Sequence, residues 1–294
     1  MGIARNWLSG DHAKGLVLAV GGILILSPDS LLVRLITADQ YSLLFWRGLM
    51  TFCTLSLYLL LTHRGQAWTQ VARIGYLGWA VALLFALNTS LFVFSIRHTS
   101  VANTLLILSL APLITALFSS LFLGEHAPRR TWVAMSIGLA CIVSIFAEKV
   151  VTGLVGDIAA VVLAMTMAAI LTIMRHQRSN NAIPIVAMSG LLLAAFMYPV
   201  ALPFSLTGND WVFMGLLGLV VIPVSFALTL SAPKYLPAPE VGLVFLLETV
   251  LGPLLVWLVL DEEPTVGTLV AGGVLIATLT IHGAMGMRSE AGLR

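Results

Sequence analysis

Ten apolar segments, each long enough to cross a lipid bilayer, take up nearly the whole chain. A membrane-spanning helix needs about 20 mainly apolar residues. Segments of this kind lie near residues 15–36, 42–62, 72–95, 99–123, 131–147, 153–175, 183–204, 211–231, 236–260 and 265–287. They are too long and continuous for a membrane β-barrel, whose strands alternate apolar and polar residues over about 10 positions. The sequence therefore predicts an all-α integral membrane protein with ten transmembrane helices.

The charge content argues against several other classes of protein. Only 10% of the 294 residues are charged, against about 25% in an ordinary soluble domain. The net charge is +2, and no basic cluster alternates with aromatic residues, which argues against nucleic-acid binding. The apolar segments leave little chain for a soluble domain, and the histidines lack the spacing of metal ligands. We therefore expect no cofactor, no metal site and no soluble partner.

The positions of lysine and arginine predict the orientation of the chain, because cytoplasmic loops retain these residues. With the N-terminus in the cytoplasm, eleven of the fifteen fall on the cytoplasmic side, three on the outer side, and Arg47 falls inside a segment. The eleven are Arg5, Lys14, Arg64, Arg73, Arg129, Arg130, Arg175, Arg178, Lys234, Arg288 and Arg294, and the three are Arg34, Arg97 and Lys149. Both termini are expected to be cytoplasmic.

The two halves of the chain resemble each other. Shifts of 137 and 141 residues bring polar positions together: Asn88 with Ser225, Asn103 with Glu240, Glu125 with Glu262, and Arg34 with Arg175. We therefore expect a first repeat at 1–147 and a second at 148–294, with five helices each. An odd number of helices inverts the second repeat in the membrane. Inverted repeats around a central cavity are a transporter architecture.

Short motifs accompany this repeat. They are Phe45-Trp46-Arg47-Gly48, Leu110-Ala111-Pro112-Leu113, Leu123-Gly124-Glu125, and Leu260-Asp261-Glu262 followed by Gly267, Gly272 and Gly273. With these motifs the whole chain resembles the drug/metabolite transporter superfamily, specifically its ten-helix EamA-type exporters. The resemblance implies a central substrate cavity and export of small metabolites across the bacterial inner membrane. Within the family, the chain is most similar to YddG-like exporters of aromatic and other neutral amino acids.

Asp29, Arg47 and Glu248 lie inside predicted helices, where a charge at the bilayer centre costs about 2.5–3.5 kcal/mol. Asp29 lies seven residues before the end of its segment and Arg47 five residues after the start of the next. Both therefore lie about 8–10 Å below the outer boundary, and we predict that they pair. The pair either holds the first two helices together, or faces a zwitterionic amino acid or gates the outer vestibule.

Glu248 lies close to the middle of the ninth segment. Facing the cavity, it would bind a substrate ammonium group or a coupling proton; alternatively, it is protonated and hydrogen-bonded to a neighbouring helix. Five weaker candidates for substrate binding are Asn88, Asn103, Ser109, Ser225 and Glu240. Such side chains also commonly bond between membrane helices, at about 0.6 kcal/mol each. Four prolines, Pro28, Pro112, Pro223 and Pro253, are expected to interrupt helices.

The sequence as a whole predicts an inner-membrane transporter that exports a small metabolite by alternating access, with neutral or aromatic amino acids as the first candidates. Its partners are the lipid bilayer and a small-molecule substrate, and it is a monomer or a homodimer. Drugs, nucleosides and other metabolites are the alternative substrates. A membrane-embedded enzyme is an alternative of a different class, but the sequence has no HExxH or GxSxG motif.

Overall fold

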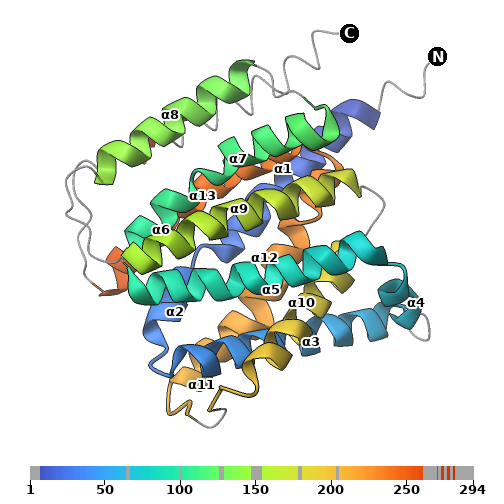
Figure 1. Ribbon diagram of the computed structural model, residues 1–294, viewed down its shortest axis with the longest axis vertical. Coiled ribbons are helices and arrows are strands. Elements are labelled where there is room, and N and C mark those ends of the chain that lie inside the picture. The colour runs from blue at the N-terminus through green and yellow to red at the C-terminus, as the bar shows by residue number, and fades with distance from the viewer. Residues whose placement is uncertain are drawn as a thin grey trace.

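The computed structural model describes residues 7–63, 67–99, 101–125, 129–146, 154–177, 181–202 and 205–260, with residues 270, 273–274, 277–278 and 281. Every regular element in these ranges is a helix (Figure 1). Six helical segments are long and apolar enough to cross a membrane, and two further apolar helices are shorter. The predicted tenth helix lies almost entirely outside the described residues. The predicted all-helical membrane fold is confirmed.

The first half follows the predicted segments closely. Its elements are α1 (Trp7–Leu26), α2 (Asp29–Leu35), α3 (Gln40–His63), α4 (Ala67–Ala72), α5 (Gly75–His98), α6 (Val101–Leu108), α7 (Ala111–Phe118), a π-helical stretch (Ser119–Leu123) and α8 (Arg129–Phe146). The first span consists of α1 and α2, and the fourth of α6, α7 and the π-helical stretch.

The second half repeats this plan. Its elements are α9 (Leu154–His176), α10 (Ala182–Met197), α11 (Asp210–Gly215), a second π-helical stretch (Leu216–Val221), α12 (Ile222–Thr229), a 3₁₀ turn (Ala232–Lys234) and α13 (Ala238–Leu260). The eighth span is therefore built from α11, a π-helical stretch and α12, as the fourth is built from α6, α7 and another.

Three of the four predicted proline interruptions coincide with irregular helix. Pro28 separates α1 from α2, Pro112 begins α7, and Pro223 begins α12. The prediction for Pro253 is wrong, because α13 runs through it without a break. Membrane helices tolerate proline where neighbouring helices and local adjustments satisfy the freed backbone groups. The seventh span is also shorter than predicted, since α10 ends at Met197, two residues before Pro199.

Glycine permits the closest approach of two helices in the bundle. Helix α3 packs against α10, and a Cβ atom on Gly48 would lie 2.6 Å from the carbonyl oxygen of Gly190. A Cβ atom on Gly190 would lie equally close to the carbonyl oxygen of Gly48. The sequence Arg47-Gly48-Leu49 in α3 corresponds to Ser189-Gly190-Leu191 in α10, so the two repeats meet at equivalent residues.

A second pair of glycines reveals matching contacts in the two halves. Gly15 in α1 packs against Tyr235 and Leu236, and Gly156 in α9 packs against His98 and Thr99. Gly156 lies 141 positions after Gly15, and Tyr235 lies 137 positions after His98. These are the two shifts that relate the halves in the sequence. The start of each repeat therefore packs on the turn before the fourth span of the other repeat.

Polar contacts tie the helices together at both ends of the first span. Near the end of α2, the hydroxyl and backbone N–H of Thr37 donate to Asp210, at 2.8 and 2.9 Å. Near the start of α1, Nε2 of His12 lies 3.1 Å from a carboxylate oxygen of Glu240. Because α1 and α2 together cross the bundle, these contacts close it at opposite ends.

The Leu123-Gly124-Glu125 motif contributes to the second of these ends. Gly124 adopts the left-handed conformation, with φ of +66°, which a residue with a Cβ atom rarely adopts. The following Glu125 accepts hydrogen bonds from Nε of Arg175 at 3.1 and 3.2 Å. Arg175 also donates to the carbonyl oxygen of Pro233, at 3.1 Å. The motif thus joins the fourth span to α9 and to the turn before α13.

Candidate functional site

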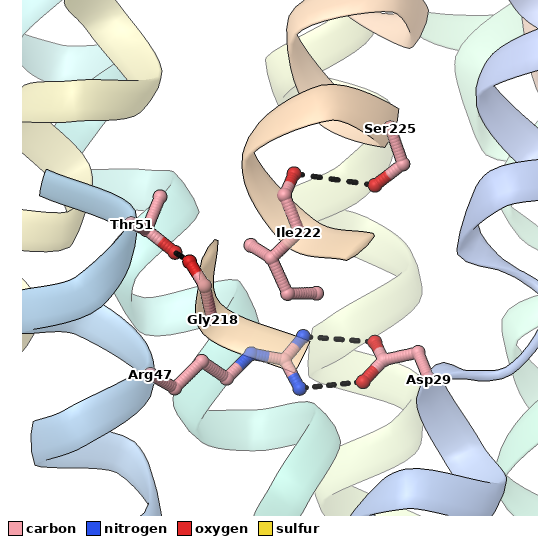
Figure 2. A network of polar contacts seen from close by, with 6 residues as sticks. All are labelled: Asp29, Arg47, Thr51, Gly218, Ile222 and Ser225. Atoms are coloured by element: carbon pink, nitrogen blue, oxygen red, sulfur yellow. Dashed lines mark hydrogen bonds and ion pairs between the residues drawn. The ribbon is translucent and has the colours of Figure 1, made fainter. Parts of the chain in front are cut away.

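Asp29 and Arg47 form a buried ion pair between the first two spans. The guanidinium NH1 and NH2 atoms donate to the two carboxylate oxygens at 2.7 and 2.8 Å. Figure 2 shows these two parallel bonds, with Arg47 reaching from α3 to the start of α2. Each residue is only 2% exposed. The predicted pairing is confirmed.

The break at Pro28 places Asp29 in this position. Proline has no N–H to donate, and α1 ends two residues before it, at Leu26. Asp29 is then the first residue of α2, where free backbone N–H groups favour a negative charge. The ring of Phe92 lies 5.9 Å from Cζ of Arg47, within the distance of a cation–π contact.

Glu248 reaches the same place from α13. A closed cavity in the middle of the bundle is lined by Asp29, Arg47 and Glu248, so the three charged positions that stood out in the sequence come together. Glu248 is 4% exposed, and it has no hydrogen-bond or ion-pair partner among the described residues. The cavity leaves about 20 Å³ for the centres of water molecules, which is room for one or two.

The remaining walls of the cavity combine aromatic rings with two polar side chains. Phe92, Phe226 and Phe245 provide the rings, and Asn88 and Thr89 provide the polar groups. One face of the cavity is therefore suited to an apolar side chain, while the ionisable residues are suited to charged groups.

One donor of the ion pair is left without a partner. Nε of Arg47 is buried and makes no hydrogen bond within the described part of the chain. A buried donor left unbonded is destabilising by about 1–3 kcal/mol, and more for a charged group. The guanidinium therefore retains bonding capacity for a small ligand or a water molecule.

Asn88 lines the cavity and also joins two helices. Its amide nitrogen donates to the carbonyl oxygen of Leu163 at 3.0 Å and to the hydroxyl of Thr166 at 2.8 Å, both on α9. The equivalent residue in the second repeat, Ser225, donates to Ile222 within its own helix at 3.2 Å (Figure 2). Ser225 does not line the cavity.

The other weak candidates lie elsewhere. Glu240 is in the first turn of α13 and pairs with His12, two helical turns before Glu248. Ser109 is buried in the turn between α6 and α7. The backbone of Asn103 lies in α6, but its side chain is outside the described part of the structure. The central cavity contains neither Glu240 nor Ser109 among its described lining residues.

The three charged residues of the cavity have no charged equivalents in the other repeat. The shifts of 141, 142 and 137 residues relate Asp29 to Ile170, Arg47 to Ser189, and Glu248 to Ala111. These three are buried as well, at 0%, 2% and 2% exposure. The same helix crossings are thus built once with charges and once without. Holding the helices together does not require the charges.

Several cavity residues were not among the sequence candidates. Phe92 follows Asn88 by four positions, Phe245 precedes Glu248 by three, and Leu26 precedes Asp29 by three. Residues three or four apart share one face of a helix. Extending each predicted polar position by one helical turn would have found them.

Asp39 stabilises the loop between α2 and α3. Partial burial raises the pKa of this carboxyl, but hydrogen bonds from Ser42, Ser205 and the backbone of Tyr41 outweigh burial, so the pKa is below its ordinary value. Ser42 also donates to the carbonyl oxygen of Leu202 at 2.7 Å. The ionised form of Asp39 therefore ties α3 to the loop that follows α10.

A second hollow, of about 480 Å³, lies between α5, the Ser119–Leu123 stretch and α9. Its walls are almost entirely apolar and include Phe118, Phe122 and Ile173. Thr172 and His176 provide its only polar side chains within the described residues. No carboxylate or guanidinium among these residues could fix a charged substrate, so the central cavity is the stronger candidate.

Comparisons with known proteins agree with this architecture. A model of the EamA-like transporter family matches residues 13–147 and again residues 154–282. A solved structure described only as the crystal structure of a protein is similar with a TM-score of 0.78 and 18% identity, over 95% of this chain and 99% of that one. At this identity the likeness concerns the fold alone. A search of the curated proteins found no match.

Proposed function

Because the chain belongs to the EamA-like transporter family, which is not an enzyme family, we propose that it exports a neutral or aromatic amino acid by alternating access. The substrate site is the central cavity, with Asp29, Arg47 and Glu248 as its charged groups. The membrane is the bacterial inner membrane, and both termini face the cytoplasm. The protein acts as a monomer or a homodimer.

The observation that carries this proposal is the buried pair of opposite charges beside a third carboxylate in a closed cavity. Buried ion pairs contribute little net stability compared with apolar residues of similar size, and the second repeat builds its equivalent crossing without them. A zwitterion needs an acceptor for its ammonium group and a donor for its carboxylate. Asp29 or Glu248 provides the first, and Arg47 provides the second.

The uncharged walls support an apolar substrate side chain. Phe92, Phe226 and Phe245 surround the charged groups, and aromatic rings contribute about 0.5–1.5 kcal/mol per favourable ring contact beyond area burial. Multiply charged substrates fit poorly, because they would leave charges without partners in the closed cavity.

The size of the cavity supports alternating access. A volume of about 20 Å³ for water centres is too small for an amino acid, and polar contacts tie the bundle at both ends. This conformation therefore fits the closed, empty carrier, and substrate enters after one end opens. Movement of helices around a fixed central site is the general mechanism of repeat-built transporters.

Counterflow in proteoliposomes tests the proposed substrate class. Vesicles are loaded in turn with unlabelled neutral, aromatic, basic and acidic amino acids, and the entry of the labelled compound is followed. We expect exchange of neutral and aromatic amino acids and none of acidic ones. Exchange of nucleosides or drugs, with silence across the amino acids, would contradict the substrate class and leave the transporter family unchanged.

A further inference from the structure

We propose that Glu248 couples transport to protons according to the charge of the substrate. A substrate of net charge +1 is exchanged for one proton, whereas a neutral substrate crosses the same cavity without net proton movement. This inference rests on the proposed function, because it concerns the same cavity, and it adds a second transport mode with its own substrate class, the organic monocations.

The argument begins with the charges that face the cavity. Asp29 and Glu248 are carboxylates and Arg47 is a guanidinium, so the fully ionised cavity has a net charge of −1. Asp29 uses both of its oxygens on the two terminal nitrogens of Arg47. The excess negative charge therefore belongs to Glu248, which has no bonding partner among the described residues.

Other charged groups lie too far along their helices to neutralise Glu248. On the elements packed against α13, the described ones are near helix ends: His12, Lys14, Arg34, Arg129, Asp157, Arg175, His176 and Lys234. His12 lies against Glu240 and Arg175 against Glu125. Helices α6 and α7 contain no titratable residue. Asp29 and Arg47 are thus the ionisable groups that share the cavity with Glu248.

The closed cavity cannot solvate an unpaired carboxylate. Glu248 is 4% exposed, and the one or two water molecules that fit beside it are too few to replace a hydration shell. An isolated ionised carboxylate in such a place is strongly disfavoured, and the group neutralises instead. The empty carrier therefore closes with one proton on Glu248.

The transport cycle follows from this requirement. When the cavity opens to the cytoplasm, Glu248 releases its proton to water, and a monocation binds to the carboxylate. The loaded cavity then has no net charge and closes. On the outer side the cation leaves, a proton from outside binds to the same carboxylate, and the empty carrier returns. One positive charge moves in each direction, so the exchange is electroneutral.

A neutral zwitterion leads to a different cycle. It adds no net charge to the cavity, so Glu248 must remain protonated when the loaded carrier closes. The proton then travels with the carrier in both directions, and no proton is moved in the complete cycle. The charge of the substrate alone decides whether transport is coupled.

Norleucine and lysine provide a matched pair of probes. Their side chains have the same length, but lysine ends in an ammonium group and has a net charge of +1. Both are followed in proteoliposomes containing the full-length protein, with and without a pH gradient of one unit and with the membrane potential held at zero. We expect the gradient to drive lysine to a concentration ratio of up to about tenfold, because one pH unit is a tenfold proton ratio. Norleucine is expected to equilibrate without accumulation.

Proton release on binding provides a readout that does not depend on transport. The purified protein in weakly buffered detergent solution is titrated with each amino acid while pH is recorded. We expect about one proton released for each lysine bound and none for norleucine. In Glu248→Gln both this release and lysine accumulation should be lost, whereas Asp157→Asn, which changes a carboxylate outside the cavity, should retain them.

The outcomes separate this inference from the proposed function. Movement of norleucine with lysine either excluded or unaffected by the pH gradient would overturn the inference and leave the proposed function in place. Absence of flux for both compounds would overturn both. Retention of lysine-driven proton release in folded Glu248→Gln would assign the proton to another residue and so overturn the inference.

Discussion

Removing the charge of Asp29 alone should destabilise the protein much more than removing Asp29 and Arg47 together. The substitution Asp29→Leu leaves a guanidinium that is 2% exposed and deletes both of its hydrogen bonds. Breaking a buried pair in this way costs about 3–5 kcal/mol, because the remaining charge is uncompensated. Glu248 lines the same cavity and can partly compensate, so we expect a loss near the lower figure, about 3 kcal/mol.

The double variant Asp29→Leu with Arg47→Met leaves no charge of the pair behind. Replacing a buried pair by apolar residues of similar volume is often neutral or stabilising. The second repeat already contains such a crossing, with Ile170 and Ser189 buried at the equivalent positions. We therefore expect the stability of the double variant to lie within about 1 kcal/mol of the native protein, while transport is lost.

Unfolding by SDS in mixed detergent micelles measures the first quantity, and counterflow in proteoliposomes measures the second. The interaction energy is the difference between the loss in the double variant and the sum of the losses in the two single variants. If the double variant lost as much stability as both single variants combined, the pair would be a structural staple and the reasoning would be refuted. Full transport by a folded double variant would refute it as well.

Three further predictions concern packing, hydrogen bonding and pH. Gly48→Ala brings a Cβ atom to 2.6 Å from the carbonyl oxygen of Gly190 and should cost at least about 1–3 kcal/mol by thermal unfolding; Gly21→Ala, which meets nothing within 4 Å, is the control and should stabilise. Asn88→Leu removes two bonds to α9 and should cost about 1 kcal/mol at about 0.6 for each bond; an unchanged unfolding free energy would contradict this. The folded-state pKa of Asp39 is lowered, so its stabilising effect is complete above an unfolded pKa of about 3.9 and is lost as pH falls through the folded pKa. Asp39→Asn should therefore flatten acid destabilisation in this range, and an unchanged pH profile would count against the assignment.

The helices were predictable from the sequence because lipid imposes a simple length and composition rule on any spanning segment. The segments around α3, α5, α9 and α13 all end within a few residues of their predicted limits. Position along the helix also placed Asp29 and Arg47 at one depth, so their contact could be predicted from arithmetic alone. Depth and chemistry, not sequence distance, decided this part of the site.

Other features depend on rotation about the helix axis, which apolar segments hardly specify. A helix that is hydrophobic all round gives no moment to show which side faces the cavity. The sequence therefore did not place Phe92 or Phe245 at the site, and it gave Glu240 the same standing as Asn88. The repeat shift of 137 residues related Asn103 to Glu240, but Glu240 contacts His12 at the end of the bundle.

The two π-helical stretches and the unbroken passage of α13 through Pro253 also escaped prediction. Both depend on whether a neighbouring helix satisfies the freed backbone groups, which is a property of packing. The single-residue shift between the two repeats, 141 in the first span and 142 in the second, became visible from the contacts of Gly15, Gly156, Gly48 and Gly190.

The most direct test of the central claim is substrate protection of a cysteine placed in the cavity. Thr89 lines the cavity beside Asn88, and Thr89→Cys would be introduced after replacing Cys53 and Cys141 by serine. The rate of labelling by a small thiol reagent is then measured in proteoliposomes with and without a transported neutral amino acid. A cysteine at Thr62, exposed at the end of α3, serves as the control.

If the substrate occupies the cavity of Asp29, Arg47 and Glu248, it will slow the labelling of the cysteine at position 89 in proportion to its occupancy and leave position 62 unaffected. An amino acid that is transported at a saturating concentration, with labelling at position 89 unchanged, would show that the substrate binds elsewhere and would contradict the account.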